Sequence, residues 1–520
     1  MPEDLPHASD RYRRKLARRR TLLRRTAYTL AIGTATLLAI YAVLYLRFNS
    51  RSPSITVDHA AELNALLPVL PAGVDPIATY EEAKHLWRDT VDAAEQAMKD
   101  NGEWPDDEDG DPMGYSIFAE IPQFTPDKPN YQTARDTLVA FRPTLDAMLA
   151  DAKYPQTGFT LDTGLAGGNL QNALFINFRL DHLGTFRHSA RLFAADHHIA
   201  AREGDADRAL ITLIGMYDLA AQMEPDPLLI NSLVTIAMRN MADQVMTETL
   251  HHHPDLWDSE QLAKLASAAK PVSLDTARFA IESEHRIVQD LIQRVYTDDG
   301  NGSGKVTPMA LTVGNGFMNL RGAPTEPSLT AKLLGPVISP FFYSRAQVTA
   351  ICQQQIDAAL DALEDPAKID LIERDPGHDS ATRQLKMLHL TDFSGIYAKY
   401  IDSAWHAKLK GDAARAVLAA HRYRAAHSEF PESLDRLVPE FLDAVPQDLL
   451  NPGAPLNYRR TDTGFVLYSV GSDADDDAGT PRDPDAPRSV LRRIGSFNER
   501  FDPNASPPDG DWILFPPEEN

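Results

Sequence analysis

The pattern of apolar and polar positions divides the chain into one apolar segment, a long helical region and a short region of strands. Residues Thr26–Leu46 read TAYTLAIGTATLLAIYAVLYL and carry no charge over twenty-one positions. A helix of about 20 apolar residues crosses the ~30 Å hydrocarbon core of a bilayer. In lipid, a helix also satisfies its own backbone hydrogen bonds. The segment therefore predicts one transmembrane helix.

The charges beside this segment predict its orientation. Residues 1–25 carry nine Lys and Arg against three acids, whereas only Arg47 and Arg51 follow closely on the other side. The positive-inside rule keeps such an N-terminus in the cytoplasm and sends residues 47–520 across the membrane. A cleaved signal peptide is the alternative, but it has an apolar core of only about 7–15 residues and a small-residue cleavage site. We therefore expect an uncleaved signal anchor in a bacterial inner membrane, with the bulk of the chain in the periplasm.

Between about residues 60 and 410, apolar residues recur at three- and four-residue spacing, which predicts a mainly helical region. Its best-defined unit is His188–Met223. Gly204 suits the left-handed residue that ends one helix, and Asp205 is a good N-cap for the next. We expect an antiparallel helical hairpin here. Its expected inner positions are Leu192, Ala195, Ile199 and Ala200 on the first helix and Ala209, Leu210, Leu213 and Tyr217 on the second.

The order Gly-Asp-x-x-Arg-Ala at this hairpin turn occurs again at Gly411–Ala416. The hairpin resembles those of tetratricopeptide proteins, and the helical region shares its general style with uncharacterised, membrane-anchored bacterial proteins. One recurrence does not make a period, and any antiparallel helix pair explains the pattern equally well. The region is therefore predicted to be a repeat-like helical array without a counted repeat.

The pattern changes near Asp412, where a helix over Asp412–His427 leads into short strands. Leu456–Arg460 and Phe465–Val470 predict two strands, and the four residues between them fit a hairpin loop. Trp512–Phe515 suits a third strand. We expect one face of the resulting antiparallel sheet to carry the helix, and the other face to meet solvent or the larger domain.

Four motifs make this region resemble the C-terminal module of type II secretion pseudopilins of the G type. They lie at Tyr423–Pro431, Leu434–Pro439, Asn451–Tyr458 and Tyr468–Gly471. The resemblance covers roughly the last hundred residues and implies a small α+β module. A pseudopilin itself is excluded, because more than 350 residues separate the membrane segment from the module, and Gly33 lacks the acid of a pilin processing site.

In those pseudopilins a calcium ion is held by the loop after the Tyr-Ser-x-Gly strand and by acids before the last strand. The resemblance therefore implies a Ca²⁺ site with Asp473, Asp475, Asp477 and Asp511 as metal ligands. The chemistry fits, since Ca²⁺ takes about six to eight oxygen ligands and crowded acids repel unless a cation bridges them. A solvated acidic loop is the alternative. The insertion Thr480–Pro508 departs from the family pattern and separates Asp511 from the loop.

Net charge excludes one class of partner. The chain carries −23, and residues 1–25 contribute +6, so residues 26–520 carry −29. Nucleic-acid binding needs Lys and Arg to replace counterions, so we expect no nucleic-acid partner. The single cysteine, Cys352, excludes an internal disulfide and is predicted to be a buried small side chain.

Two other clusters are interpreted as structural. Asp299–Gly304 opens like an EF-hand loop, but Ala310 stands where that loop needs its bidentate Glu, so a Gly-rich turn is predicted. His197, His198 and His251–His253 lack an HExxH arrangement, and three successive histidines at a helix end cannot all face one metal. We expect these histidines to lie at the surface or to cap helix ends.

The predicted fold class is mainly α, with one transmembrane helix, a large helical-hairpin domain and a small pseudopilin-like α+β module. The favoured function is a membrane-anchored, extracytoplasmic interaction or scaffold protein, with a link to secretion or envelope assembly. The alternative is an exported hydrolase whose active site is assembled only in space, and no catalytic or cofactor-binding residue is assigned. The expected parts are a basic tail (1–25), the anchor (26–46), a stalk (47–59), the helical domain (60–410) and the module (411–520).

Overall fold

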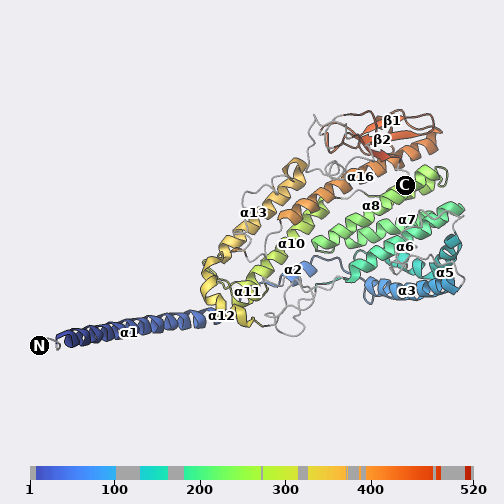
Figure 1. Cartoon of the computed structure of the whole chain (residues 1–520). Coiled ribbons are helices and arrows are strands. Elements are labelled where there is room, and N and C mark those ends of the chain that lie inside the picture. Colours follow the sequence, from blue (N-terminus) through green and yellow to red (C-terminus); the bar gives the residue numbers. More distant parts are fainter. Residues whose placement is uncertain are drawn as a thin grey trace.

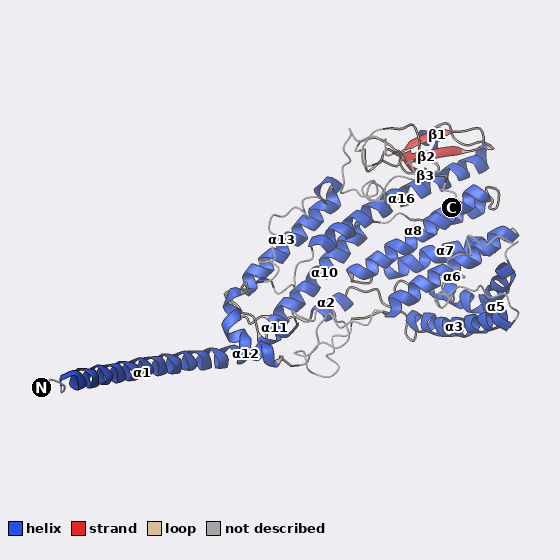
Figure 2. Cartoon of the chain, in the orientation of Figure 1, coloured by secondary structure: helices blue, strands red, loops and turns tan. Residues whose placement is uncertain are grey.

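The architecture is taken from a computed structural model, in which an elongated helical body carries one long projecting helix and a small sheet (Figures 1 and 2). The structure describes residues 7–100, 129–161, 181–270, 273–313, 326–369, 372, 386–387, 394–451, 453–471, 476–481 and 510–516.

The projecting helix, α1, spans His7–Asn49 and contains the predicted transmembrane segment. At 1.5 Å per residue its 43 residues extend about 65 Å. Its apolar side chains do not pack on the body; Leu30, Ile32 and Leu37 are each about two-thirds exposed. Within the described residues, α1 is the one helix long and apolar enough to cross a bilayer, and its place near the N-terminus suits a membrane anchor or a signal sequence.

The body is a stack of helices that runs from α3 and α5 at one end through α6, α7, α8 and α16 to the sheet at the other (Figure 1). This confirms the predicted helical character of the central region. The helices are α2 (His59–Asn64), α3 (Pro76–Asp100), α5 (Pro129–Asp151), α6 (Asp181–Glu203), α7 (Ala206–Met223), α8 (Leu229–His252), α9 (Ser259–Ala268), α10 (Leu274–Val295), α11 (Pro308–Val313), α12 (Leu329–Ile338), α13 (Arg345–Glu364) and α16 (Ser394–His427).

The predicted hairpin is confirmed as the pair α6 and α7. Gly204 ends α6 with φ +75°, a conformation that glycine adopts without strain. The Asp205 carboxylate caps α7 by accepting a 3.1 Å hydrogen bond from the Arg208 amide. All eight predicted inner positions are buried.

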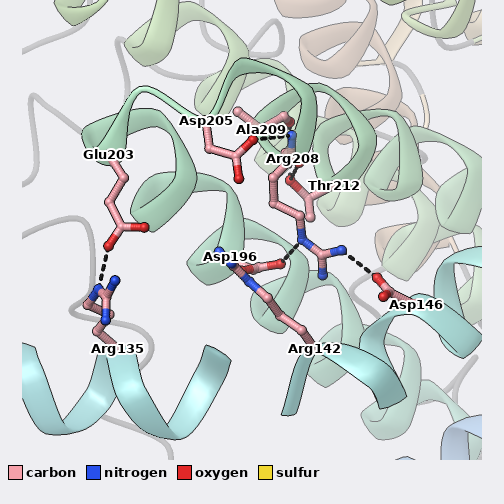
Figure 3. Close-up of polar contacts among 9 residues, drawn as sticks. All are labelled: Arg135, Arg142, Asp146, Asp196, Glu203, Asp205, Arg208, Ala209 and Thr212. Atoms are coloured by element: carbon pink, nitrogen blue, oxygen red, sulfur yellow. Dashed lines mark hydrogen bonds and ion pairs between the residues drawn. The ribbon is translucent and has the colours of Figure 1, made fainter. Parts of the chain in front are cut away.

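A buried carboxylate fixes this hairpin against α5 (Figure 3). Asp196 is fully buried, and its two oxygens accept hydrogen bonds from Arg142 Nε at 2.8 Å and Arg208 Nε at 2.5 Å. Arg208 also pairs with Asp146, so its guanidinium bridges α5, α6 and α7. Removing one partner of so buried an ion pair generally costs about 3–5 kcal/mol. The network therefore holds three helices in one arrangement.

The second Gly-Asp motif does not form a turn, and the expectation that the hairpin chemistry recurs there is wrong. Helix α16 runs without a break from Ser394 to His427, and Gly411 lies buried within it. Asp412 accepts a 2.9 Å hydrogen bond from Lys408 one turn earlier, so its carboxylate is satisfied inside the helix. Helix α16 therefore crosses the predicted boundary between residues 410 and 411.

The predicted sheet is confirmed. Strands β1 (Asn457–Arg460), β2 (Phe465–Ser469) and β3 (Trp512–Phe515) form an antiparallel sheet in the order β1-β2-β3. The hairpin loop closes with a 2.9 Å hydrogen bond from the Thr461 amide to the Gly464 carbonyl. Both faces of β2 are largely covered, because Gly479 packs beside the Tyr468 ring and Tyr468 Oη donates to Asp476 Oδ1 at 3.1 Å.

One hydrophobic core joins the helical array and the sheet. It is continuous from Tyr80 on α3, through α6, α7, α8 and α16, to Phe465 and Phe515 on the strands. The ring of His421 on α16 lies 6.1 Å from Phe465 and 6.2 Å from Phe515, between the helix and the sheet. The module is thus built on the same core as the helices.

Candidate functional site

Two of the four predicted calcium ligands lie in the described part of the chain, and the fold brings them to the same place. The Asp511 amide donates to the Thr480 carbonyl at 2.8 Å, so the chain returns to the acidic loop after the insertion. Asp511 Oδ2 accepts a 2.7 Å hydrogen bond from the Gly479 amide, and Asp477 lies in the same turn, where its carbonyl accepts from Thr480 Oγ1 at 2.7 Å. Asp473 and Asp475 lie outside the described residues.

The surroundings of Asp511 disfavour an uncompensated charge. Burial raises its pKa to about 6; hydrogen bonds from the Gly479 and Asp477 amides lower it, and the charges of Asp476 and Asp477 raise it further. A divalent cation would relieve this repulsion. In the part of the chain that the structure describes, however, no three His, Cys, Asp or Glu side chains gather as a metal site. The four-ligand calcium site remains a prediction.

Sequence analysis missed the carboxylate that holds this module together. Asp448 is buried and accepts hydrogen bonds from Ser469 Oγ at 2.8 Å and the Val470 amide at 3.0 Å. Its own amide donates to the Ala454 carbonyl at 2.9 Å. Asp448 thus ties the Asn451–Tyr458 motif to the Tyr468–Gly471 motif.

A groove of about 620 Å³ lies where the helical array meets the module. Pro254, Asp255 and Trp257 form its wall on the helical side, the C-terminal end of α16 forms its floor, and the β1–β2 hairpin forms the opposite wall. Arg424 crosses the groove, donates to the Pro254 carbonyl at 3.1 Å and pairs with Asp255. The walls therefore carry both signs of charge.

His421 lies at the floor of this groove and is 3% exposed. Burial, with the nearby charges of Arg424 and His251, lowers its pKa to about 3, so the imidazole is neutral. Neither ring nitrogen has a hydrogen-bond partner among the described residues. Because both ring nitrogens are buried and the imidazole is neutral, His421 is not suited to proton transfer at neutral pH.

One buried and one half-buried carboxyl group near the N-terminus of α8 have strongly shifted pKa values. Burial raises the pKa of Asp226 to about 8, against hydrogen bonds from Thr157 and Asn231 that lower it. Thr157 Oγ1 lies 3.1 Å from each Asp226 oxygen, and Asn231 Nδ2 lies 3.2 Å from Oδ2. Burial likewise raises the pKa of Glu284 to about 7, while the Leu229 amide donates to it at 3.4 Å.

These carboxyl groups do not face the groove, and they do not line the second cavity, of about 380 Å³, beside the end of α1. Glu284 satisfies the first amide of α8, whose preceding residue Leu228 has no capping side chain. Asp226 ties the turn before α8 to Thr157. Shifted pKa values often mark functional groups, but at these two positions they accompany structural hydrogen bonds.

The remaining sequence candidates have structural roles. The Gly-rich turn is confirmed: Asp299 Oδ1 accepts from the Asn301 and Ser303 amides, each at 3.0 Å. Cys352 is buried, as predicted. The surface expectation is wrong for His197, which is buried, with Nδ1 donating to the Ala209 carbonyl at 2.8 Å and Nε2 lying 2.8 Å from Thr249 Oγ1. His253 closes α8 through its amide, which donates to the Thr249 carbonyl.

No family model, no curated protein and no solved structure matches this chain. The pseudopilin-like and tetratricopeptide-like resemblances therefore stay predictions.

Replacing Asp226 with Asn should flatten the dependence of stability on pH. The pKa of Asp226 rises from 3.8 to about 8 on folding, so between these values the unfolded chain loses a proton that the native chain keeps. Unfolding then releases a proton, and the free energy of unfolding falls as pH rises, by at most ~1.4 kcal/mol per unit. Asp226→Asn removes this loss, because its neutral amide has the shape of the protonated carboxyl group and does not titrate. Its stability relative to the wild type should increase from about pH 5 to about pH 7.5 in denaturant titrations.

Asp462→Asn is the matched control, because Asp462 is exposed in the hairpin loop. Its stability relative to the wild type should stay level over the same range. If the stability of Asp226→Asn relative to the wild type is the same at both ends of this pH range, Asp226 is ionised in the native protein.

Proposed function

We propose that this chain is a membrane-anchored, extracytoplasmic protein that binds a polypeptide partner in the groove between its helical array and its C-terminal module. Helix α1 serves as an uncleaved anchor in a bacterial inner membrane, with the N-terminus inside and the body in the periplasm. The exposed apolar side chains along α1 and the basic residues before Thr26 support this orientation.

The composition of the groove carries the proposal. Its exposed residues include Ser428, Glu429, Asp462 and Thr463, and Arg460 pairs with Glu429 at 3.0 Å. Charges of both signs match the polar rim of a protein interface. The neutral His421 below has both ring nitrogens buried, so it closes the floor of the groove without adding a charge. A partner bound here would contact both halves of the molecule at once.

An exported hydrolase remains the alternative. Such an enzyme needs acids and histidines that converge on a reachable cavity. Here, the carboxyl groups with the largest upward pKa shifts, Asp226 and Glu284, satisfy interior hydrogen bonds, and Asp255 in the groove is engaged by Arg424. These observations favour the binding protein. The pseudopilin-like module further suggests an accessory role in a secretion or envelope machine.

Calcium belongs to this proposal as a structural ion of the module. We propose that Asp473, Asp475, Asp477 and Asp511 hold one Ca²⁺, which would join the acidic loop to the start of β3. The return of Asp511 to Thr480 and Gly479 supports the site, because it sets a carboxylate from beyond the insertion against the loop.

Filling the groove should abolish capture of the partner. A photoreactive benzoylphenylalanine at Thr463, an exposed groove residue, should cross-link one defined envelope protein in intact cells. Adding Ala425→Trp, also in the groove, should eliminate that product. Ala140→Trp is the control, since Ala140 is equally exposed but lies on α5, and it should leave the product unchanged.

A product that survives Ala425→Trp, or one that also forms from a probe at exposed Ile211 on α7, would contradict binding in the groove.

Calcium should raise the melting temperature of the full chain in detergent. Binding to the folded state alone adds ~2.7 kcal/mol when free Ca²⁺ is about a hundred times Kd. Asp473→Ala with Asp511→Asn should remove the calcium-dependent rise, and Asp462→Asn should keep it. The measured quantity is the shift between calcium and chelator within each variant, so a lower baseline melting temperature does not affect the comparison. A wild-type chain that shows no shift would mean that the acidic loop is only solvated.

A further inference from the structure

A short apolar helix lies beside the end of α1 with one of its faces uncovered. Helix α12 (Leu329–Ile338) continues into the 3-10 turn η4 (Ser339–Phe341). Exposed apolar side chains follow the i, i+4, i+8 spacing of one helical face, and the two end residues are 72% and 71% exposed. We name this face the apolar stripe: Leu329, Leu333, Leu334, Val337, Ile338 and Phe341.

The opposite face of α12 packs on the last turns of α1. Tyr41 Oη donates to the Leu333 carbonyl at 2.8 Å, and Asn49 Nδ2 donates to the Lys332 carbonyl at 3.1 Å. Gly335 lies so close to Phe48 that an added Cβ would be 2.1 Å from Phe48 Cε1. These contacts tie α12 to α1 over the segment from Tyr41 to Asn49, next to one another in Figure 1.

This attachment fixes the depth of α12 relative to the apolar segment. Tyr41 precedes Leu46, the last residue of that segment, by five positions, or about 7.5 Å along the helix axis. Side chains on a helix lean toward its N-terminus, so the Tyr41 hydroxyl lies deeper still, and the Leu333 carbonyl is hydrogen-bonded to it. If α1 crosses the bilayer, Leu333 is at the level of the hydrocarbon and not of bulk water.

We propose that Leu329–Phe341 is embedded in the extracytoplasmic leaflet, with the apolar stripe in contact with lipid acyl chains. The inference rests on the proposed anchor role of α1 and adds a second membrane contact that fixes how the body sits on the bilayer. A helix suits this place because its backbone groups are internally bonded. Interfacial helices commonly bury an apolar face about 5–10 Å into a leaflet.

The residues at the headgroup level support a lipid neighbour. The 380 Å³ cavity beside α1 and α12 is lined by Tyr45, Asn49, Arg51, Arg294 and Lys332, with no acidic side chain in its lining. Arg294 is paired with Asp290 outside the lining at 2.6 Å, and Arg51 donates to the Val306 carbonyl at 3.0 Å. Basic side chains just beyond a hydrocarbon core attract lipid phosphates, so the polar and apolar parts of this surface match one bilayer.

Spin-label depth measurements on the full chain test the proposal in nanodiscs of phosphatidylethanolamine and phosphatidylglycerol. In a Cys352→Ala background, nitroxides are placed by Leu334→Cys and Val337→Cys. Leu37→Cys reports the anchor, and Val69→Cys, an exposed apolar position on the body, reports water. Labels at 334, 337 and 37 should be more accessible to oxygen, which partitions into lipid, than to a water-soluble nickel chelate. The label at 69 should be more accessible to the nickel chelate than to oxygen.

The outcomes separate the two claims. A lipid signal at 37 with a water signal at 334 and 337 would overturn the inference and leave the anchor intact. A water signal at 37 would overturn both.

A second measurement needs no substitution. The wild-type chain is photolysed in bilayers whose phospholipids carry an acyl-chain diazirine. Lipid adducts should form on the tryptic peptides Thr26–Arg47 and Leu333–Arg345 and be lacking on Ser52–Lys84, which contains the exposed Leu66 and Val69. Adducts on Thr26–Arg47 without adducts on Leu333–Arg345 would overturn the proposal.

Discussion

Burial of α16 between Tyr397 and His421 is the interaction on which the arrangement of the molecule depends. Its N-terminal half packs on α8, α10 and α13, where Trp405 Nε1 donates to the Ala362 carbonyl at 3.0 Å. Its C-terminal half packs on α9 and β3 and presents His421 to the aromatic side chains of the sheet. One helix thus belongs to two regions that the sequence pattern separates. Because both regions pack on this helix, we expect them to form one cooperative core.

This shared core decides which surfaces remain for function. Interior polar groups such as Asp196, Asp226 and Asp448 are held by arginine, threonine, asparagine or backbone partners, so their positions explain structure. In the part of the chain that the structure describes, the groove beside the end of α16 and the apolar stripe on α12 are surfaces that packing leaves uncovered. In Figure 1, α12 lies beside α1, whereas the C-terminal end of α16 lies beside the sheet, on the far side of the body. A body held on the bilayer at one end would present the groove away from it.

Local patterns were sufficient to predict the elements whose causes are local. The charge-free run gave α1, the pair Gly204 and Asp205 gave the hairpin turn, and alternation gave the strands to within one residue. The same Gly-Asp pair at Gly411 led to the wrong prediction of a second turn. A buried glycine is tolerated there, in a helix whose neighbours pack closely on it. Lys408 then satisfies Asp412 without a turn. Propensity alone does not distinguish these two settings.

The candidate sites depended on contacts that a linear pattern does not contain. The groove joins residues near 255, 424 and 462, and α12 meets α1 across a separation of 292 residues. The sequence did contain a signal for the buried ion-pair network. Asp196 falls on the apolar face of α6 that carries Leu192 and Ile199, and a charge at such a position predicts a buried partner of opposite charge. Of the calcium site, the sequence placed Asp477 and Asp511, which the fold brings together, whereas Asp473 and Asp475 lie outside the described residues.

The most direct test of the account is whether the helical array and the module unfold together. Hydrogen exchange of the full chain in detergent, pulsed across a denaturant series, follows amides of β2 and of α7 separately. If α16 joins them in one core, both sets should lose protection at the same denaturant concentration. Loss of protection in β2 at a clearly lower concentration, while α7 and α8 stay protected, would show that the module folds on a core of its own and would contradict the account.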